Sequence, residues 1–168
     1  MNRKLFVLLA SLALPLGGAG DAALDRATMR GLKAVSVAID PVAPEVEREG
    51  VTADVLRTRL EDRLQAAGVK VDAASIEFVG LRLISVRAAR GPLAIAASIG
   101  VYQPLTLNRD RTVKTVAQTW EVNTVLLADP KMVYRACMDS VDELADRFVT
   151  AYKSVNPAAG GAPPEREK

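Results

Sequence analysis

The sequence predicts an α+β protein: a single, mostly antiparallel sheet with two helices on one face, in the order β-α-β-β-β-β-α. Apolar residues recur at helical spacing twice, once in the first half of the chain and once near its end. Between them lies a long strand-rich region that turn-forming residues divide into three segments. A sheet that carries both helices on one face buries all of these apolar stripes against each other.

The first 22 residues have the pattern of a secretory signal peptide. A basic start precedes an apolar run from Leu5 to Leu14, and Pro15 and small residues follow. The run is shorter than the roughly twenty residues that cross a bilayer. We expect cleavage between Ala19 and Ala23, no stable membrane span afterwards, and a location in the periplasm or outside the cell. A retained anchor is the alternative.

Residues 30–157 are expected to form one domain, and residues 158–168 a disordered tail. The tail is rich in small residues and Pro and ends in charges, so it cannot bury apolar surface. The remaining length suffices for one hydrophobic core. Cys137 is the only cysteine and allows no intramolecular disulfide. Packing must therefore stabilise the domain.

The first half of the domain should be a strand, a helix and a short strand. Residues 32–40 alternate between larger and smaller apolar side chains, which predicts the first strand. Thr52 is a suitable N-cap for the helical spacing that follows, and Gly68 ends it. Residues 69–71 are then a short strand, parallel to the first if the helix makes the usual right-handed crossover.

Three further strands, at residues 76–88, 93–107 and 112–125, should form an antiparallel meander. The turn-forming stretches ARGP and NRDR separate them. Pro104 lies within the second of these strands and has no backbone N–H to donate to a neighbour. That strand should therefore lie at an edge or be bulged near its end.

A long amphipathic helix should follow, with Asp129 as its N-cap and Pro130 at its first position. Apolar side chains then recur every three or four residues at Val133, Cys137, Val141, Leu144, Phe148 and Tyr152. This stripe should face the sheet, and the helix should end before Asn156. Within the stripe Cys137 is expected to be a buried, unreactive thiol.

The opposite side of that helix carries a run of acidic residues: Asp139, Asp142, Glu143 and Asp146. Arg135 and Arg147 lie four residues from Asp139 and Glu143, so basic partners on the same helix are expected. A single straight helix cannot wrap a cation. We interpret the run as a solvated face. A metal site is the alternative and would need ligands from a second element.

The composition argues against most catalytic chemistries. The chain has no histidine, no phosphate-binding glycine loop and no calcium-loop sequence. No catalytic residue, cofactor or metal ligand is predicted, and we expect that the protein is not an enzyme. An enzyme that uses carboxylates alone stays open, for example with Glu77 and Glu121 on neighbouring strands.

Nucleic acid is not an expected partner. The 22 basic residues are nearly balanced by 20 acidic ones, whereas nucleic-acid binding requires a concentrated basic surface. The middle of the chain has a mild excess of arginines, which we interpret as solvated hairpin ends: Arg82, Arg87, Arg90, Arg109 and Arg111.

The face of the sheet without helices is the predicted interaction surface. Its residues are mostly small, beside two larger aliphatic side chains: Ala94, Ala96, Ser98, Gly100, Tyr102, Ile84 and Val86. A smooth apolar face suits the docking of an envelope protein or of a second copy. We therefore expect a non-catalytic periplasmic interaction or accessory module. The alternative is a protein that binds a small apolar ligand or a lipid between helices and sheet.

The stretches GLKAVSVAIDP, LRTRLEDRLQAAGVKV and SVDELADRFVTAYKSVNP, in this order, resemble small exported domains of Gram-negative bacteria that have no assigned activity. The arrangement is also similar to the anticodon-binding-like domains of envelope proteins, such as the N-terminal domain of the translocation protein TolB. The resemblance covers residues 30–157 and implies a fold and a compartment. It contains no functional motif and implies no site residues.

Overall fold

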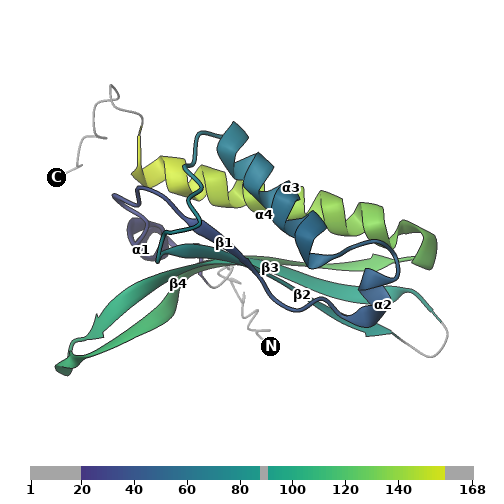
Figure 1. Cartoon of the computed structure of the whole chain (residues 1–168), viewed down its shortest axis with the longest axis horizontal. Coiled ribbons are helices and arrows are strands. Elements are labelled where there is room, and N and C mark those ends of the chain that lie inside the picture. Colours follow the sequence, from purple (N-terminus) through teal and green to yellow (C-terminus); the bar gives the residue numbers. More distant parts are fainter. Residues whose placement is uncertain (1–19, 88–90, 158–168) are drawn as a thin grey trace, which may run out of the picture.

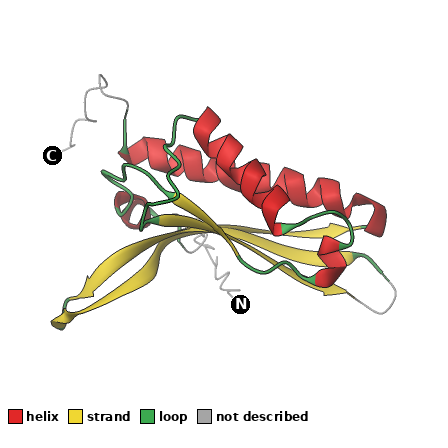
Figure 2. Cartoon of the chain, viewed as in Figure 1, coloured by secondary structure: helices red, strands yellow, loops and turns green. Residues whose placement is uncertain are grey.

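The sheet has four strands, β1 (Ser36–Ile39), β2 (Phe78–Arg87), β3 (Leu93–Leu107) and β4 (Asp110–Ala128), which lie side by side in that order. β1 is parallel to β2, and the other neighbours are antiparallel. The computed structural model describes residues 20–87 and 91–157. Figure 1 and Figure 2 show the two long helices on one face of the sheet. The predicted α+β class is confirmed.

The long helices are α3 (Ala53–Ala66) and α4 (Val133–Val155). The Thr52 side chain caps α3 as predicted, because its Oγ1 accepts a hydrogen bond of 3.3 Å from the backbone N–H of Val55. Before α4, Pro130–Met132 form a 3-10 turn, so α4 begins later than the sequence predicts. The Asp129 side chain makes no capping bond, and only its carbonyl accepts one, from the N–H of Met132 at 2.8 Å.

Two short helices were not predicted: α1 (Ala23–Ala27) and α2 (Pro44–Glu47). α1 precedes residue 30, and the segment in front of it bonds to β4 through Glu121 N–H and the carbonyl of Gly20, at 3.1 Å. The described body therefore extends to Gly20. Most of the predicted signal peptide and the predicted tail, residues 1–19 and 158–168, lie outside the described residues.

The predicted short strand at residues 69–71 is reduced to one parallel bridge, between Val71 and Val35. The backbone N–H of Val69 is bonded to the carbonyl of Leu64 at 3.0 Å, so the end of α3 uses it. Asp72 follows directly and forms a turn, with Ala74 N–H donating to its carboxylate at 3.0 Å. The segment has no room to pair over a longer stretch.

The predicted first strand is also shorter, since only Ser36–Ile39 form a ladder with β2. β3 has the predicted bounds and lies between β2 and β4. β2 pairs with β3 only as far as Tyr102, so Pro104 faces a free edge on that side, and register shifts follow Val101 and Thr106. Pro104 was predicted to lie at an edge or near a bulge, and the structure shows both a local edge and register shifts nearby.

The core lies between the helices and one face of the sheet. α3 contributes Leu56, Leu60 and Leu64, each completely buried. From the predicted α4 stripe Val133, Cys137, Val141, Leu144 and Phe148 are completely buried, while Tyr152 is half-buried. The sheet contributes the alternate residues of β3 that were predicted to face the helices: Leu93, Ile95, Ala97, Ile99 and Val101. The other face of the sheet has no long helix over it (Figure 1).

Candidate interaction surface

The register of three strands brings the predicted surface residues together on the uncovered face of the sheet. Ile84 lies opposite Ala96 and Val86 opposite Ala94, and Ala96 and Ala94 in turn lie opposite two residues of β4, Val125 and Leu127. Opposite residues of neighbouring strands point to the same face. These pairs form two cross-strand rows, which we call the apolar patch: Ile84, Val86, Ala94, Ala96, Val125 and Leu127.

The apolar patch is exposed to an unusual degree for its composition. Ile84 and Val86 are 55% and 67% exposed, and Val125 and Leu127 are each 72% exposed. The small side chains of Ala94 and Ala96 lie between these large ones, so the middle of the patch protrudes less than its two sides. Contiguous exposed aliphatic side chains with a polar border are typical of interaction sites.

Val125 and Leu127 were missed at the sequence level. They lie two residues apart in one strand and alternate with better-buried neighbours. This two-residue period could have been recognised in the sequence. The predicted strand stopped at Val125, whereas β4 continues to Ala128. Pairing with β3 then decides which face these residues occupy.

The next row along the sheet is polar and forms a border of the apolar patch. It holds Arg82, Ser98 and Asn123 from the three strands. A hollow of about 220 Å³ lies here, lined by parts of this row, Ala96 and Glu121. Arg82 Nε donates to an Asp40 carboxylate oxygen at 2.6 Å, which raises the pKa of the Arg82 guanidinium.

Gly100 and Tyr102 belong to a packed cluster at the far end of the same face. The Tyr102 ring stacks on Phe78 with 4.7 Å between ring centroids and 4° between the planes. A Cβ added at Gly80 would lie 2.8 Å from the Tyr102 ring. Gly100 is buried beneath the side chain of Gln118, whose amide would meet an added Cβ at 2.6 Å. The stacked rings need a glycine at position 80, whereas at position 100 an added Cβ would meet only the movable end of the Gln118 side chain.

The acidic run on α4 finds most of its partners on α3. Asp142 accepts from Arg59 Nε at 2.8 Å and lies 3.6 Å from Arg63 Nε. Arg63 also donates to both Asp146 oxygens, at 2.6 and 2.7 Å. Sequence spacing could not reveal these pairs, because they join residues 83 positions apart.

The predicted partners on the same helix are only partly realised. Arg135 lies 3.7 Å from Asp139, but both side chains are largely exposed. Arg147 instead donates to the carbonyl of Asn123 on β4, at 3.0 Å. No group of three or more potential metal ligands occurs within residues 20–87 and 91–157.

The structure also places the residues that the sequence offered for nucleophilic or carboxylate chemistry, namely Cys137 and the pair of Glu77 and Glu121. Cys137 is completely buried, and this burial raises the pKa of its thiol to about 11. A thiol that stays protonated is a poor nucleophile. Glu77 and Glu121 do not face each other on neighbouring strands, because Glu121 pairs with Gly100 of β3, which separates it from β2.

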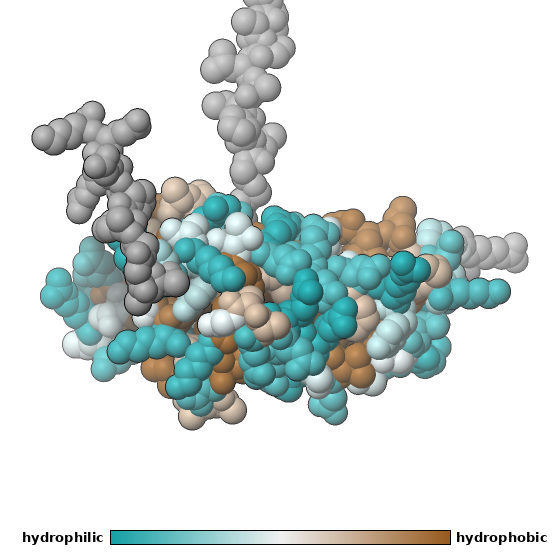
Figure 3. Space-filling view, turned by 90° about the horizontal axis from the view of Figure 1, so that it is seen from above, coloured by the Kyte–Doolittle hydropathy of each residue, from teal (hydrophilic) through white to brown (hydrophobic). Residues whose placement is uncertain are grey.

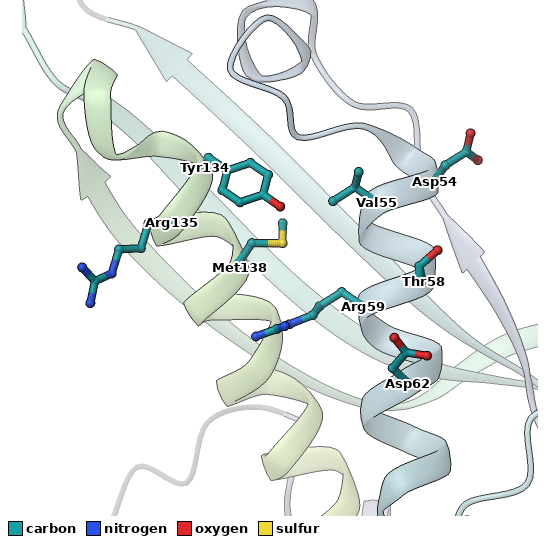
Figure 4. A pocket seen from close by; sticks show the side chains of 8 residues that line it. All are labelled: Asp54, Val55, Thr58, Arg59, Asp62, Tyr134, Arg135 and Met138. Carbon is teal, nitrogen blue, oxygen red and sulfur yellow. The ribbon is translucent and has the colours of Figure 1, made fainter.

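A groove between the two long helices has a volume of about 590 Å³. In Figure 4, Tyr134 and Met138 of α4 point toward Val55 of α3, while Arg135 points away. Charged side chains of α3, among them Asp54 and Asp62, complete the lining. The predicted ligand site was between helices and sheet, whereas this groove opens between the helices.

The outer surface of the helix layer is mainly hydrophilic. Figure 3 looks onto this layer, and hydrophilic side chains cover most of its middle, with apolar areas between them. None of the helices within the described ranges combines the length and apolar character that crossing a membrane requires.

Comparisons with known proteins leave the family open. No protein-family model matches, and no curated protein matches. Among solved structures, a dodecamer of a PelC variant from Paraburkholderia phytofirmans is 10% identical with a TM-score of 0.42, over 69% of this chain and 85% of that one. A minor lipoprotein from Acinetobacter baumannii is 12% identical with a TM-score of 0.35, over 74% and 92%.

The rare lipoprotein B from Shewanella oneidensis is 16% identical with a TM-score of 0.32, over 73% of this chain and 96% of that one. Two of these three structures are thus lipoproteins. TM-scores this low establish neither a shared fold nor a shared role. The resemblance to anticodon-binding-like envelope domains stays a prediction.

Proposed function

We propose that this chain is a non-catalytic interaction module of the bacterial envelope, and that its apolar patch docks against the same patch of a second copy. The exposure of Ile84, Val86, Val125 and Leu127, between 55% and 72%, is the observation that carries this proposal. Burying side chains of this size against a partner contributes about 25 cal/mol per Å² of apolar area.

The arrangement of charges around the apolar patch favours a second copy as the occupant. Arg82 lies on β2, and Glu121 lies on β4, on the other side of β3. In a face-to-face pair with a two-fold axis along β3, the β2 side of one copy covers the β4 side of the other. Arg82 of each copy, while paired with its own Asp40, then also approaches Glu121 of its mate, and aliphatic rows meet aliphatic rows.

Two features of the sequence and the burial of Cys137 support the rest of the proposal. The signal-peptide pattern at the start of the chain supports a location in the envelope. The lack of histidine in the sequence and the raised pKa of Cys137 support a role without catalysis. The activity proposed for the chain is therefore binding.

Light scattering of the exported chain, as wild type and as Ala96→Arg, tests the proposal. Ala96 lies between Ile84 and Val125, so an arginine there places a charge in the middle of the interface. We expect a dimer for the wild type and a monomer for Ala96→Arg. Ala66→Arg is the matched control, because Ala66 is an exposed residue of α3 and should leave the dimer intact.

Capture of envelope proteins with the same variants separates the other outcomes. A monomeric wild type whose capture of a partner is lost in Ala96→Arg would assign the patch to a different envelope protein. A wild type that stays monomeric at high concentration, with capture unaltered in Ala96→Arg, would show that the patch is no interface.

The groove between α3 and α4 supports the second candidate, binding of a small apolar ligand. Its volume of about 590 Å³ is in the range of small-molecule sites, and Val55, Tyr134 and Met138 give it an apolar part. Native mass spectrometry of the exported chain should then show a bound molecule that Thr58→Trp displaces, since the larger side chain fills the groove. Protein free of any such molecule would count against it.

A further inference from the structure

The β3–β4 hairpin extends beyond the rest of the sheet. After the last pair with β2, at Tyr102, residues 103–117 pair only with each other, and we call them the arm. Figure 1 shows the arm projecting away from the helix layer. A ribbon of two strands is marginally stable in water by itself. A surface that covers such an arm would therefore stabilise it.

The arm has aliphatic side chains on both of its faces. Leu105, Val113 and Val116 are 40%, 41% and 52% exposed. Leu105 is opposite Thr115 and Val116 is opposite Pro104. Consecutive pairs of a ladder point to opposite faces, so Leu105 and Val116 lie on opposite sides of the ribbon. One flat partner surface would cover only one of these sides.

The tip of the arm is basic. Arg109, Arg111 and Lys114 are exposed, and none of them takes part in an ion pair among the described residues. Asp110 is the only acidic residue of the arm, which leaves a net charge of +2 from three basic residues minus one acidic residue.

The Asp110 carboxylate turns back into its own hairpin. It accepts from the backbone N–H of Thr112 at 3.0 Å and from the Thr112 hydroxyl at 2.7 Å. The Thr112 hydroxyl, followed by this backbone N–H, lowers the pKa of Asp110. The basic side chains therefore project from the tip without a carboxylate partner directed toward them.

We propose that the arm binds the headgroup region of an anionic phospholipid bilayer. The basic side chains contact lipid phosphates, and the aliphatic side chains on both faces enter the boundary between headgroups and acyl chains. A bilayer interface surrounds the inserted ribbon, which accounts for apolar side chains on both sides. An acidic protein would match the charge but leave one of these faces in water.

Vesicle binding of the exported full chain tests this inference. We expect binding to phosphatidylcholine vesicles that contain phosphatidylglycerol, and much weaker binding to phosphatidylcholine alone. The variant Arg109→Gln, Arg111→Gln, Lys114→Gln should bind roughly a hundredfold more weakly, since each basic residue near such a surface contributes about a factor of five. High salt should weaken wild-type binding in the same direction.

The matched control removes three exposed basic residues outside the arm: Arg30→Gln, Arg48→Gln, Lys131→Gln. It has the same net charge as the arm variant and should bind nearly as the wild type does. Arg109→Lys with Arg111→Lys should retain binding, because the charge stays. Val113→Ser with Val116→Ser should weaken the binding that remains at high salt.

No binding of the wild type to the anionic vesicles would overturn the inference. Equal losses in the arm variant and the control variant would do so as well, because they would reflect net charge alone. Capture of an acidic protein by the arm without vesicle binding would assign the arm to a protein partner. The arm variant should leave the mass in light scattering unaltered, which separates this test from that of the apolar patch.

Discussion

At the scale of single residues, Cys137 shows how burial controls chemistry. Its thiol is completely buried among apolar side chains of α4. We expect that Cys137→Ser lowers the free energy of unfolding by about 1–3 kcal/mol, because a hydroxyl replaces an apolar neighbour there. Denaturant unfolding measures this loss. A thiol reagent should label the native protein only slowly, and rapid labelling would contradict the burial.

The same residue should make stability depend on alkaline pH. Its folded pKa of about 11 is above the ordinary value of 9.0, so the buried neutral thiol stabilises the fold fully below pH 9. As the pH rises from 9 toward 11, the thiol of the unfolded chain ionises first and this contribution is lost. Cys137→Ala lacks the effect, so the difference in stability between wild type and variant should shrink over this range.

Asp21 is a second residue whose surroundings control its pKa and its contribution to stability. Its carboxylate accepts from Trp120 Nε1 at 2.9 Å and pairs with Arg26 at 2.7 Å. The hydrogen bond from Arg26, followed by that from Trp120, lowers the pKa of Asp21. We expect that Asp21→Asn lowers the free energy of unfolding by about 1–2 kcal/mol at neutral pH. Denaturant unfolding monitored by tryptophan fluorescence measures this change.

The sign of the pH effect follows from the lowered pKa. The carboxylate stabilises the fold above its ordinary pKa of 3.8, and this stabilisation is lost as the pH falls through the lower folded value. The difference between wild type and Asp21→Asn should therefore shrink in acid. A difference that stays constant down to strong acid would show that the charge of Asp21 is not the cause.

At the scale of elements, the glycines of β2 and β3 allow a matched comparison. Gly80→Ala drives a Cβ to within 2.8 Å of the Tyr102 ring, which is stiff and held by its stack on Phe78. Gly100→Ala meets the end of the Gln118 side chain, which can move away. We expect a loss of about 1 kcal/mol for Gly80→Ala and almost none for Gly100→Ala. Equal melting temperatures of the two variants would contradict the stacked arrangement.

The ion pairs between α3 and α4 make a prediction about salt. Asp142→Asn removes the partner of Arg59 and a neighbour of Arg63, so it should lower the melting temperature more than Asp139→Asn does, since Asp139 has only an exposed partner 3.7 Å away. Exposed charges are screened by salt, so this difference should decrease in molar NaCl.

Calcium provides the control for the same helix face. Millimolar calcium should leave the melting temperature nearly unchanged, because arginines already occupy the carboxylates of Asp142 and Asp146. A saturable rise of several degrees that Asp142→Asn abolishes would instead show a cation site.

At the scale of the whole molecule, the contacts of Gly20 and Asp21 bear on processing. Cleavage was expected between Ala19 and Ala23. A cut after Gly20 would remove the Gly20 carbonyl that accepts from the Glu121 N–H, and a cut after Asp21 or Ala22 would also remove the bonds of Asp21 to Trp120 and Arg26. We predict a cut directly after Ala19, which keeps these bonds. Intact mass of the exported chain would identify its first residue. A chain that begins at Ala22 or Ala23 would show that the fold does not need this segment.

Sequence patterns determined the elements whose character is local. The bounds of β3, the buried stripe of α4 and the cap at Thr52 follow from the period of the side chains and from nearby polar groups. The small face of β3 was likewise predictable, because alternate residues of a strand point to one side. α1 escaped prediction because Ala23–Ala27 is too short for a periodic signal and has no buried residue.

Only the tertiary structure decided which distant segments meet. β1 pairs with β2, whereas residues 69–71 form only one bridge. Arg63 of α3 forms an ion pair with Asp146 of α4. The apolar patch needs Val125 and Leu127 beside Ala96 and Ala94, which is a matter of register between strands. Register and helix contacts depend on the packing of the whole core, whereas periodicity depends on neighbours in the chain. For this reason the sequence predicted the residues that β2 and β3 contribute to the apolar patch, whereas the tertiary structure added Val125 and Leu127 of β4.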